Sequence, residues 1–356
     1  MSFINSIKIK SKFMLMLVFP IAGLLYFSID GIWEKSRLSS EMKTVENLSV
    51  LAVKISTLVH EVQKERGFTE MFIGSKGKEF VSELHIQRLE TDKQIADLKK
   101  FLKDYDFDTS SRLGVEFKNS IAEGLTAFDN IELRRKAADR LTISTGEMIT
   151  YYSNLIDISL NVVAQASKLS TNAEISTMIA AHTTFLFAKE RAGRERAVLI
   201  NTFAQDKFGE GMFNKFSAIV AEQEVYTNVF LSFATDNQKD FYKAKMQGQF
   251  IDETARIRKI VFENANKGGF GIDASYWFKT QTGKINLLKE VEDRLSNDLS
   301  SKAGQLKSQA QAASALFMLL TVVIFVNAIV WAFIITRAIT RQSSLRKTFL
   351  GMHLKR

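Results

Sequence analysis

A single proline, Pro20, occurs among the 356 residues of this chain. Proline removes a backbone hydrogen-bond donor and ends or kinks a helix, so a chain nearly free of it can form very long helices. The 18 glycines are spread thinly, and apolar residues recur at three- and four-residue steps rather than in alternation. The sequence therefore predicts an all-α protein with no β-strand.

Two apolar segments lie near the ends of the chain. Residues 13–29 and 312–335 contain no charged side chain, and each is long enough to cross a membrane as a helix. Three lysines in residues 1–12 and six Lys or Arg in residues 336–356 account for the whole net charge of +9. Because positive flanks belong on the cytoplasmic side of a membrane, we expect both chain ends in the cytoplasm.

This pattern predicts five parts. They are a basic cytoplasmic N-terminus (1–12), a transmembrane helix (13–29), an extracytoplasmic sensor domain (30–311), a second transmembrane helix (312–335) and a short basic cytoplasmic tail (336–356). We expect the inner membrane of a bacterium, with the sensor domain in the periplasm. Membrane lipid is then a partner and nucleic acid is not, because the basic residues form membrane flanks and no basic face.

The segment between the apolar runs reads as a series of amphipathic helices. Apolar periodicity and polar breaks predict helices over residues 33–73, 79–101, 113–140, 144–167, 172–203, 208–233 and 238–265, and from Ser275 onward. The clearest loop is Asn266 to Gly271. We predict helical bundles, two in number, with long helices shared between them.

Two Glu-Arg steps beside glycines carry the chemistry. They are Glu65-Arg66-Gly67 and, later, Gly193 with Glu195-Arg196. A guanidinium group stays charged and offers paired planar donors, which suits a small planar anion in a site poor in carboxylates. We predict that the two helices meet and that Arg66 and Arg196 hold the anion, with one glutamate offsetting the second charge. Glu65 and Glu195 point about 100° from their neighbouring arginines and are expected to pair elsewhere.

Arg191 and Arg194 are further candidates for the anion site. They lie three residues apart, about 60° around the helix, and can share a face. Arg196 lies about 160° from Arg194, so those two cannot serve one small site. An alternative explanation makes Arg191 and Arg194 surface arginines paired with Glu190 or Glu195, and makes Arg66 and Arg196 buried structural ion pairs.

The same motifs resemble those of a known family. The segments HEVQKERGFTEMFIGSKGKEF (60–80) and FAKERAGRERAVLINTFAQDKF (187–208) are similar to the two motifs of the nitrate- and nitrite-sensing domain called NIT. Residues 276–280, followed by Ile285, Leu288, Val291 and Glu292, resemble its closing helix, and the resemblance covers roughly residues 48–299. It implies two four-helix bundles with nitrate or nitrite bound between them. Arg66 and Arg196 match the motif arginines, whereas Arg191 and Arg194 fall at variable positions.

The resemblance implies a sensor for chemotaxis-type or two-component signal transduction, and a homodimer. Its linker departs from the family pattern, because Gln342 and Ser343 stand where a proline is expected. No output domain follows, so we expect a cytoplasmic signalling partner or a truncated receptor. Two alternatives stay open: a helical-bundle receptor fragment for a small organic ligand, and a membrane interaction or regulatory subunit without a ligand.

Neither an enzyme nor a metalloprotein is expected. His60-Glu61 lacks the second histidine of a zinc helix motif, since Lys64 stands at that position. The chain has no cysteine, and no nucleophile, base and orienting group can be assigned. We therefore expect no catalytic residue, no metal ligand and no cofactor.

Overall fold

The computed structural model describes residues 9–105 and 110–353, and side chains are described from residue 22 onward, apart from Leu24 and several positions after Trp331. These residues form helices, turns and loops without a strand, so the all-α prediction is confirmed for the described part of the chain. The chain divides into two units, Thr44–Gly304 and the pair Met1–Lys43 with Gln305–Arg356. The helices α2 (Ile9–Gly74) and α11 (Ala274–His353) contribute residues to both.

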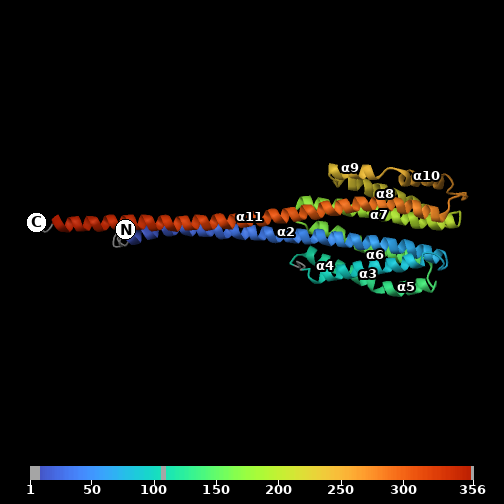
Figure 1. Ribbon diagram of the computed structural model, residues 1–356, viewed down its shortest axis with the longest axis horizontal. Coiled ribbons are helices and arrows are strands. Elements are labelled where there is room, and N and C mark those ends of the chain that lie inside the picture. Colours follow the sequence, from blue (N-terminus) through green and yellow to red (C-terminus); the bar gives the residue numbers. More distant parts are fainter. Residues whose placement is uncertain (1–8, 106–109, 354–356) are drawn as a thin grey trace. The chain divides into compact units, whose positions relative to one another are not determined.

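Within Thr44–Gly304 the helices form two groups (Figure 1). The first bundle consists of α2, α3 (Val81–Lys103), α4 (Arg112–Ala127), α5 (Ile131–Asp139) and α6 (Thr145–Leu169). The second bundle consists of α7 (Ala173–Ala204), α8 (Met212–Phe233), α9 (Asp236–Lys245), α10 (Gln249–Glu263) and α11. Each bundle contributes one motif helix, α2 and α7, to the site described below.

Apolar side chains hold the second bundle together and join it to α2. One buried cluster contains Phe216, Ile257, Val261 and Trp277 of the second bundle together with Met71 of α2. Another gathers Phe185, Phe230, Leu288 and Leu295. Burial of such large apolar side chains is the main favourable contribution to folding. The contact between α2 and the second bundle is therefore stabilised in part by apolar packing.

Two predicted helices are each interrupted in the structure. Residues 113–140 form α4 and α5 with one 3-10 turn, Phe128–Asn130, between them. Residues 238–265 form α9 and α10, separated at Gly248, whose φ is +94°. α9 ends at Lys245, and Gly248, with a positive φ that glycine adopts readily, stands directly before the first residue of α10. Four other predicted helices lie within a few residues of their observed bounds, namely 79–101, 144–167, 172–203 and 208–233. The predicted helix 33–73 is instead the C-terminal part of α2, which begins at Ile9. Gly268, Gly269 and Gly271 give the predicted loop its positive φ values.

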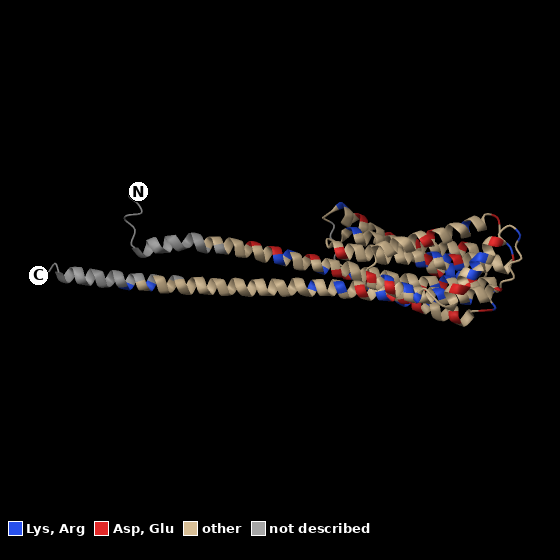
Figure 2. Cartoon of the chain, turned by 90° about the horizontal axis from the view of Figure 1, so that it is seen from above, with Lys and Arg blue, Asp and Glu red and all other residues tan. Residues whose placement is uncertain are grey.

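The apolar segment 312–335 lies within α11. Residues 308–336 carry no charge, which appears as an unbroken tan stretch in Figure 2. This part of α11 is long and apolar enough to cross a membrane, and none of it is buried against the rest of the structure. In the run 13–29, the side chains of residues 13–21 and Leu24 lie outside the described residues, as do residues 1–8 and part of the tail after Thr336.

Candidate functional site

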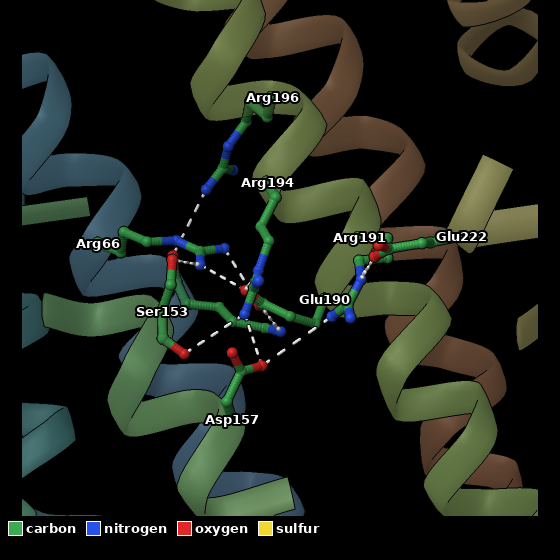
Figure 3. Close-up of polar contacts among 9 residues, drawn as sticks. Arg66, Ser153, Asp157, Glu190, Arg191, Arg194, Arg196 and Glu222 are labelled. Atoms are coloured by element: carbon green, nitrogen blue, oxygen red, sulfur yellow. Dashed lines mark hydrogen bonds and ion pairs between the residues drawn. The ribbon is translucent and has the colours of Figure 1, made fainter. Parts of the chain in front are cut away.

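Arg66 of α2 and Arg196 of α7 meet between the two bundles, with the Arg196 side chain extending toward Arg66 (Figure 3). Both are buried, with exposed fractions of 1% and 5%. Lys and Arg are almost never buried to this extent unless they are paired, so each guanidinium needs an explanation. The predicted meeting of the two motif helices is therefore observed.

Two glycines make room for these guanidinium groups. A Cβ atom on Gly67 would lie 2.3 Å from Nη2 of Arg196, and one on Gly193 would lie 2.5 Å from Nη2 of Arg66. Each arginine thus rests against a glycine of the opposite motif helix. Both positions are helical, so these glycines serve close approach and not a special backbone conformation.

Arg66 is paired with protein groups on two other helices. Its Nη1 donates to Glu190 Oε1 at 2.6 Å and to Ser153 Oγ at 2.9 Å, and its Nη2 donates to Glu190 Oε2 at 3.2 Å. Burial opposes ionisation of Glu190, but Arg66 and Arg194 outweigh it and keep the pKa of Glu190 below its usual value. Glu190 is the carboxylate that offsets the buried positive charge, and the site is richer in carboxylate than the sequence led us to expect.

Arg194 and Arg191 are occupied by carboxylates on the side of the site. Arg194 donates to Glu190 at 2.8 Å and to Asp157 at 2.6 Å. Arg191 donates to Glu222 at 2.5 Å, and its guanidinium stacks 5.1 Å from the Tyr226 ring. Both arginines also reach Asp157, as their 60° separation predicted. The alternative explanation made them surface arginines paired with Glu190 or Glu195. Arg194 does pair with Glu190, whereas Arg191 pairs with Glu222, and both side chains are mostly buried.

Arg196 differs from the other three arginines. Its Nη1 donates to Thr282 Oγ1 at 2.9 Å, Nη2 lies 3.5 Å from the Gln63 carbonyl oxygen, and its guanidinium lies 4.9 Å from the Phe278 ring. Among the described residues no carboxylate lies within ion-pair distance of it, and Nε has no hydrogen-bond partner. Burial lowers the pKa of Arg196 to about 10, with Arg66 adding to this and Glu70 and Glu190 opposing it. Arg196 is thus a buried cation that forms no ion pair with a carboxylate in the part of the chain that the structure describes.

The glutamates beside the motif arginines pair away from the site. Glu65 accepts from Arg135 at 2.7 Å and from Tyr152 at 2.6 Å within the first bundle. Glu195 accepts from Arg258 at 2.5 Å and from Gln281 at 2.9 Å within the second. In both motifs the glutamate binds inside its own bundle while the arginine points to the other bundle, as the helical spacing predicted.

Residues 57–300 match the sequence profile of the family described as nitrate and nitrite sensing, NIT. The chain belongs to the NIT family. It is 26% identical over 281 residues to the nitrate regulatory protein of Klebsiella oxytoca, a match that covers 78% of this chain and 69% of the relative. It also resembles the solved structure of the NasR transcription antiterminator, with a TM-score of 0.70 and 23% identity over 82% of this chain and 83% of the other. The latter likeness concerns the fold.

Several polar residues of the candidate site were not predicted from the sequence. Gln63 donates to Glu190 at 2.8 Å, and Ser153 and Thr282 bind the two arginines from α6 and α11. Glu70 is buried one helical turn after Arg66. Spacing alone could have suggested Gln63 and Glu70, which share a helix with Arg66. It could not have suggested Ser153 or Thr282, whose helices reach the site only through the tertiary fold.

A second buried polar cluster of the NIT domain joins α2, α7 and α11. Lys189 forms an ion pair with Glu292, and both side chains are fully buried. Glu292 also accepts from Ser56 at 2.6 Å and lies 3.3 Å from Lys289, while His60 Nδ1 lies 3.3 Å from Lys189 Nζ. We call these five residues the Lys189 cluster. Through ion pairs and hydrogen bonds, it links α2 of the first bundle to α7 and α11 of the second.

Proposed function

We propose that this chain binds nitrate or nitrite between Arg66 and Arg196 and acts as the sensor module of a signal-transduction system. One observation carries the proposal: Arg196 is a buried guanidinium without a carboxylate partner among the described residues, directly opposite Arg66. An unpaired buried charge is costly, so a site that keeps one is built for an ion that arrives from solvent.

The chemistry of the site suits a small planar oxyanion. Arg66 and Arg196 carry two positive charges, and Glu190 offsets one of them. A monovalent anion offsets the other and accepts hydrogen bonds from the free Nε of Arg196. Nitrate spreads one negative charge over three coplanar oxygens, which matches the planar donors of a guanidinium group.

Calorimetric titration of the purified full chain with nitrate, nitrite and chloride tests this proposal. Saturable binding of one of the two oxyanions, with chloride weaker, is the expected result. A folded protein that binds neither oxyanion would contradict it and would favour an organic ligand or a ligand-free interaction subunit.

The glycine beside Arg66 provides a test of geometry that spares the charges. Gly67→Ala is expected to weaken nitrate binding about tenfold or more, because the new methyl group displaces the Arg196 guanidinium and costs a charged hydrogen bond. The thermal midpoint should not fall, since alanine favours a helix over glycine by about 1 kcal/mol. In the control Gly124→Ala, the methyl group would lie 3.8 Å from Ile158 and Val162, an ordinary contact. Equal nitrate affinity in both variants would contradict the role of Gly67.

The proposal extends to the membrane. We place segments 13–29 and 312–335 across the cytoplasmic membrane, with the bundles outside and both chain ends inside, as in a homodimeric receptor with a cytoplasmic signalling partner. Arg196 supports a route for the signal, because its side chain binds Thr282 and its carbonyl oxygen accepts from Trp277 at 3.1 Å, both on α11. A change at Arg196 therefore acts directly on the helix that leads to the apolar segment.

The absence of cysteine makes this topology easy to test, because any introduced thiol is unique. Lys118→Cys, exposed on α4, is expected to react with a membrane-impermeant maleimide in intact bacterial cells. Arg341→Cys should react only after the membrane is opened. Labelling of Lys118→Cys that also requires opened cells would contradict an extracytoplasmic sensor.

A further inference from the structure

Glu70 is the one carboxylate at the anion site that the protein leaves without a partner among the described residues. Its side chain is 3% exposed, and neither Oε1 nor Oε2 has a hydrogen-bond partner. A buried carboxylate normally has partners for its lone pairs, as Glu65, Glu190 and Glu195 do in the same region. Burial without them requires a separate explanation.

Helix geometry places Glu70 beside the Arg196 guanidinium. Glu70 lies three residues after Gly67 and four after Arg66, so it lies between these two residues around α2, about 60° from the first and about 40° from the second. Side chains on a helix lean toward its N-terminus, which directs the Glu70 carboxyl group back over the turn that contains Gly67. Arg196 rests on that turn, since its Nη2 lies 2.3 Å from where a Gly67 Cβ would be. Glu70 therefore borders the space in which an anion would meet Arg196.

The charges that face Glu70 are Arg66 from α2 and Arg196 from α7, while α11 and α6 supply the neutral Thr282, Phe278 and Ser153 to these arginines. Burial raises the pKa of Glu70 to about 7, although Arg196 and Arg66 act in the opposite direction. Glu190 already neutralises Arg66, so Arg196 is the charge for which an ionised Glu70 and a bound anion would compete. Two anions beside one cation repel, and protonation of Glu70 removes the conflict.

We infer that Glu70 is part of the anion site and binds its ligand in the carboxylic acid form, with its O–H donated to the bound anion. The inference rests on the proposed anion function of the site. Each anion then enters with one proton from solvent, so the pair that binds is neutral overall. The charge of the site is the same before binding, with ionised Glu70, and after it, with the anion in place of that charge.

This assignment fixes the sign of the pH dependence. Nitrate stays ionised at all relevant pH values, so the protein is the titrating partner. Above the pKa of Glu70 the fraction in the binding form falls, and the affinity should fall about tenfold for each further pH unit. Below that pKa the affinity should be constant. A site of two arginines without Glu70 would not show this fall in affinity.

The test compares the full chain with Glu70→Gln, which is isosteric, permanently neutral and able to donate from its amide. Nitrate affinity is measured by calorimetry from pH 6 to pH 9. We expect the parent to lose about 100-fold in affinity over this range and Glu70→Gln to lose less than about twofold. At pH 9 the variant should bind more tightly than the parent. Glu79→Gln, which removes a charge from an exposed position nine residues further on, should behave as the parent does.

A second readout counts protons. Titrations at pH 8 in buffers with different ionisation enthalpies should show uptake of about one proton per nitrate in the parent and none in Glu70→Gln. Nitrate binding with the same pH profile and proton count in both proteins would overturn the role of Glu70 and leave the anion site standing. Absence of nitrate binding to the parent at every pH would overturn the anion site itself.

Discussion

Arg196→Ala is expected to abolish saturable nitrate binding and to leave the protein folded with its stability nearly unchanged. The lost interactions are the hydrogen bond to Thr282, the longer one to the Gln63 carbonyl oxygen and the contact with the Phe278 ring. Against them stands relief from burying a guanidinium that has no carboxylate partner among the described residues, a state that costs free energy on folding. Titration with nitrate and thermal unfolding of the same sample measure the two effects.

Arg66→Ala provides the contrast. It should also abolish nitrate binding, but it removes one partner of a buried ion pair and leaves Glu190 with Arg194 and the neutral amide of Gln63. We expect the free energy of unfolding to fall by about 3 kcal/mol, the lower end of the cost of breaking such a pair. Nitrate binding of parental affinity in Arg196→Ala would place the anion elsewhere. Equal destabilisation by both substitutions would show that Arg196 is a structural arginine.

Glu292→Ala is expected to destabilise the protein more than any substitution at the anion site, by about 3 to 5 kcal/mol. It would leave the fully buried Lys189 ammonium without its counterion, and Ser56 without the acceptor of its hydroxyl. Burial opposes the ionisation of Glu292, but Lys189 and Lys289 outweigh it and lower the pKa of Glu292. Chemical denaturation at pH 7 measures the loss.

The depressed pKa also sets the pH range of this contribution. The contribution of ionised Glu292 to the free energy of unfolding is fully present above the ordinary pKa of a glutamate, about 4.3. It is lost as pH falls toward the pKa of Glu292 in the folded state. The control is Glu290→Ala, on the same helix as Glu292. It breaks a partly exposed ion pair with Lys245 of α9. That change should cost less than about 1 kcal/mol. If the two substitutions cost the same, the Lys189 cluster contributes no more than a surface pair.

The directions of side chains around a single helix were predictable from the sequence. The angle between Arg191 and Arg194 predicted that they share a face, and both reach Asp157. The angle between Glu65 and Arg66 predicted that they point to different partners, and Glu65 binds Arg135 while Arg66 binds Glu190. Such angles follow from the helix repeat and need no knowledge of the tertiary fold.

Contacts between side chains of two different helices were not predictable from the sequence. Nothing in the spacing of α7 indicates that Lys189 meets Glu292 or that Arg196 meets Thr282, because α11 begins 70 residues after α7 has ended at Ala204. The break at Gly248 was missed for a local reason. Apolar residues keep a helical period on both sides of it, so periodicity could not reveal the change of backbone conformation.

The two glycine contacts depend on the position of α7 along the axis of α2. Arg196 of α7 packs against Gly67 of α2, and Arg66 of α2 packs against Gly193 of α7. Each helix therefore contributes one arginine and one glycine to the contact. If α7 moved along α2 by about 1.5 Å, the rise of one residue, both guanidinium groups would lose their positions over these glycines together. If the site binds an anion as proposed, both arginines reach it only in this alignment of the two bundles, and binding would favour this alignment over its neighbours.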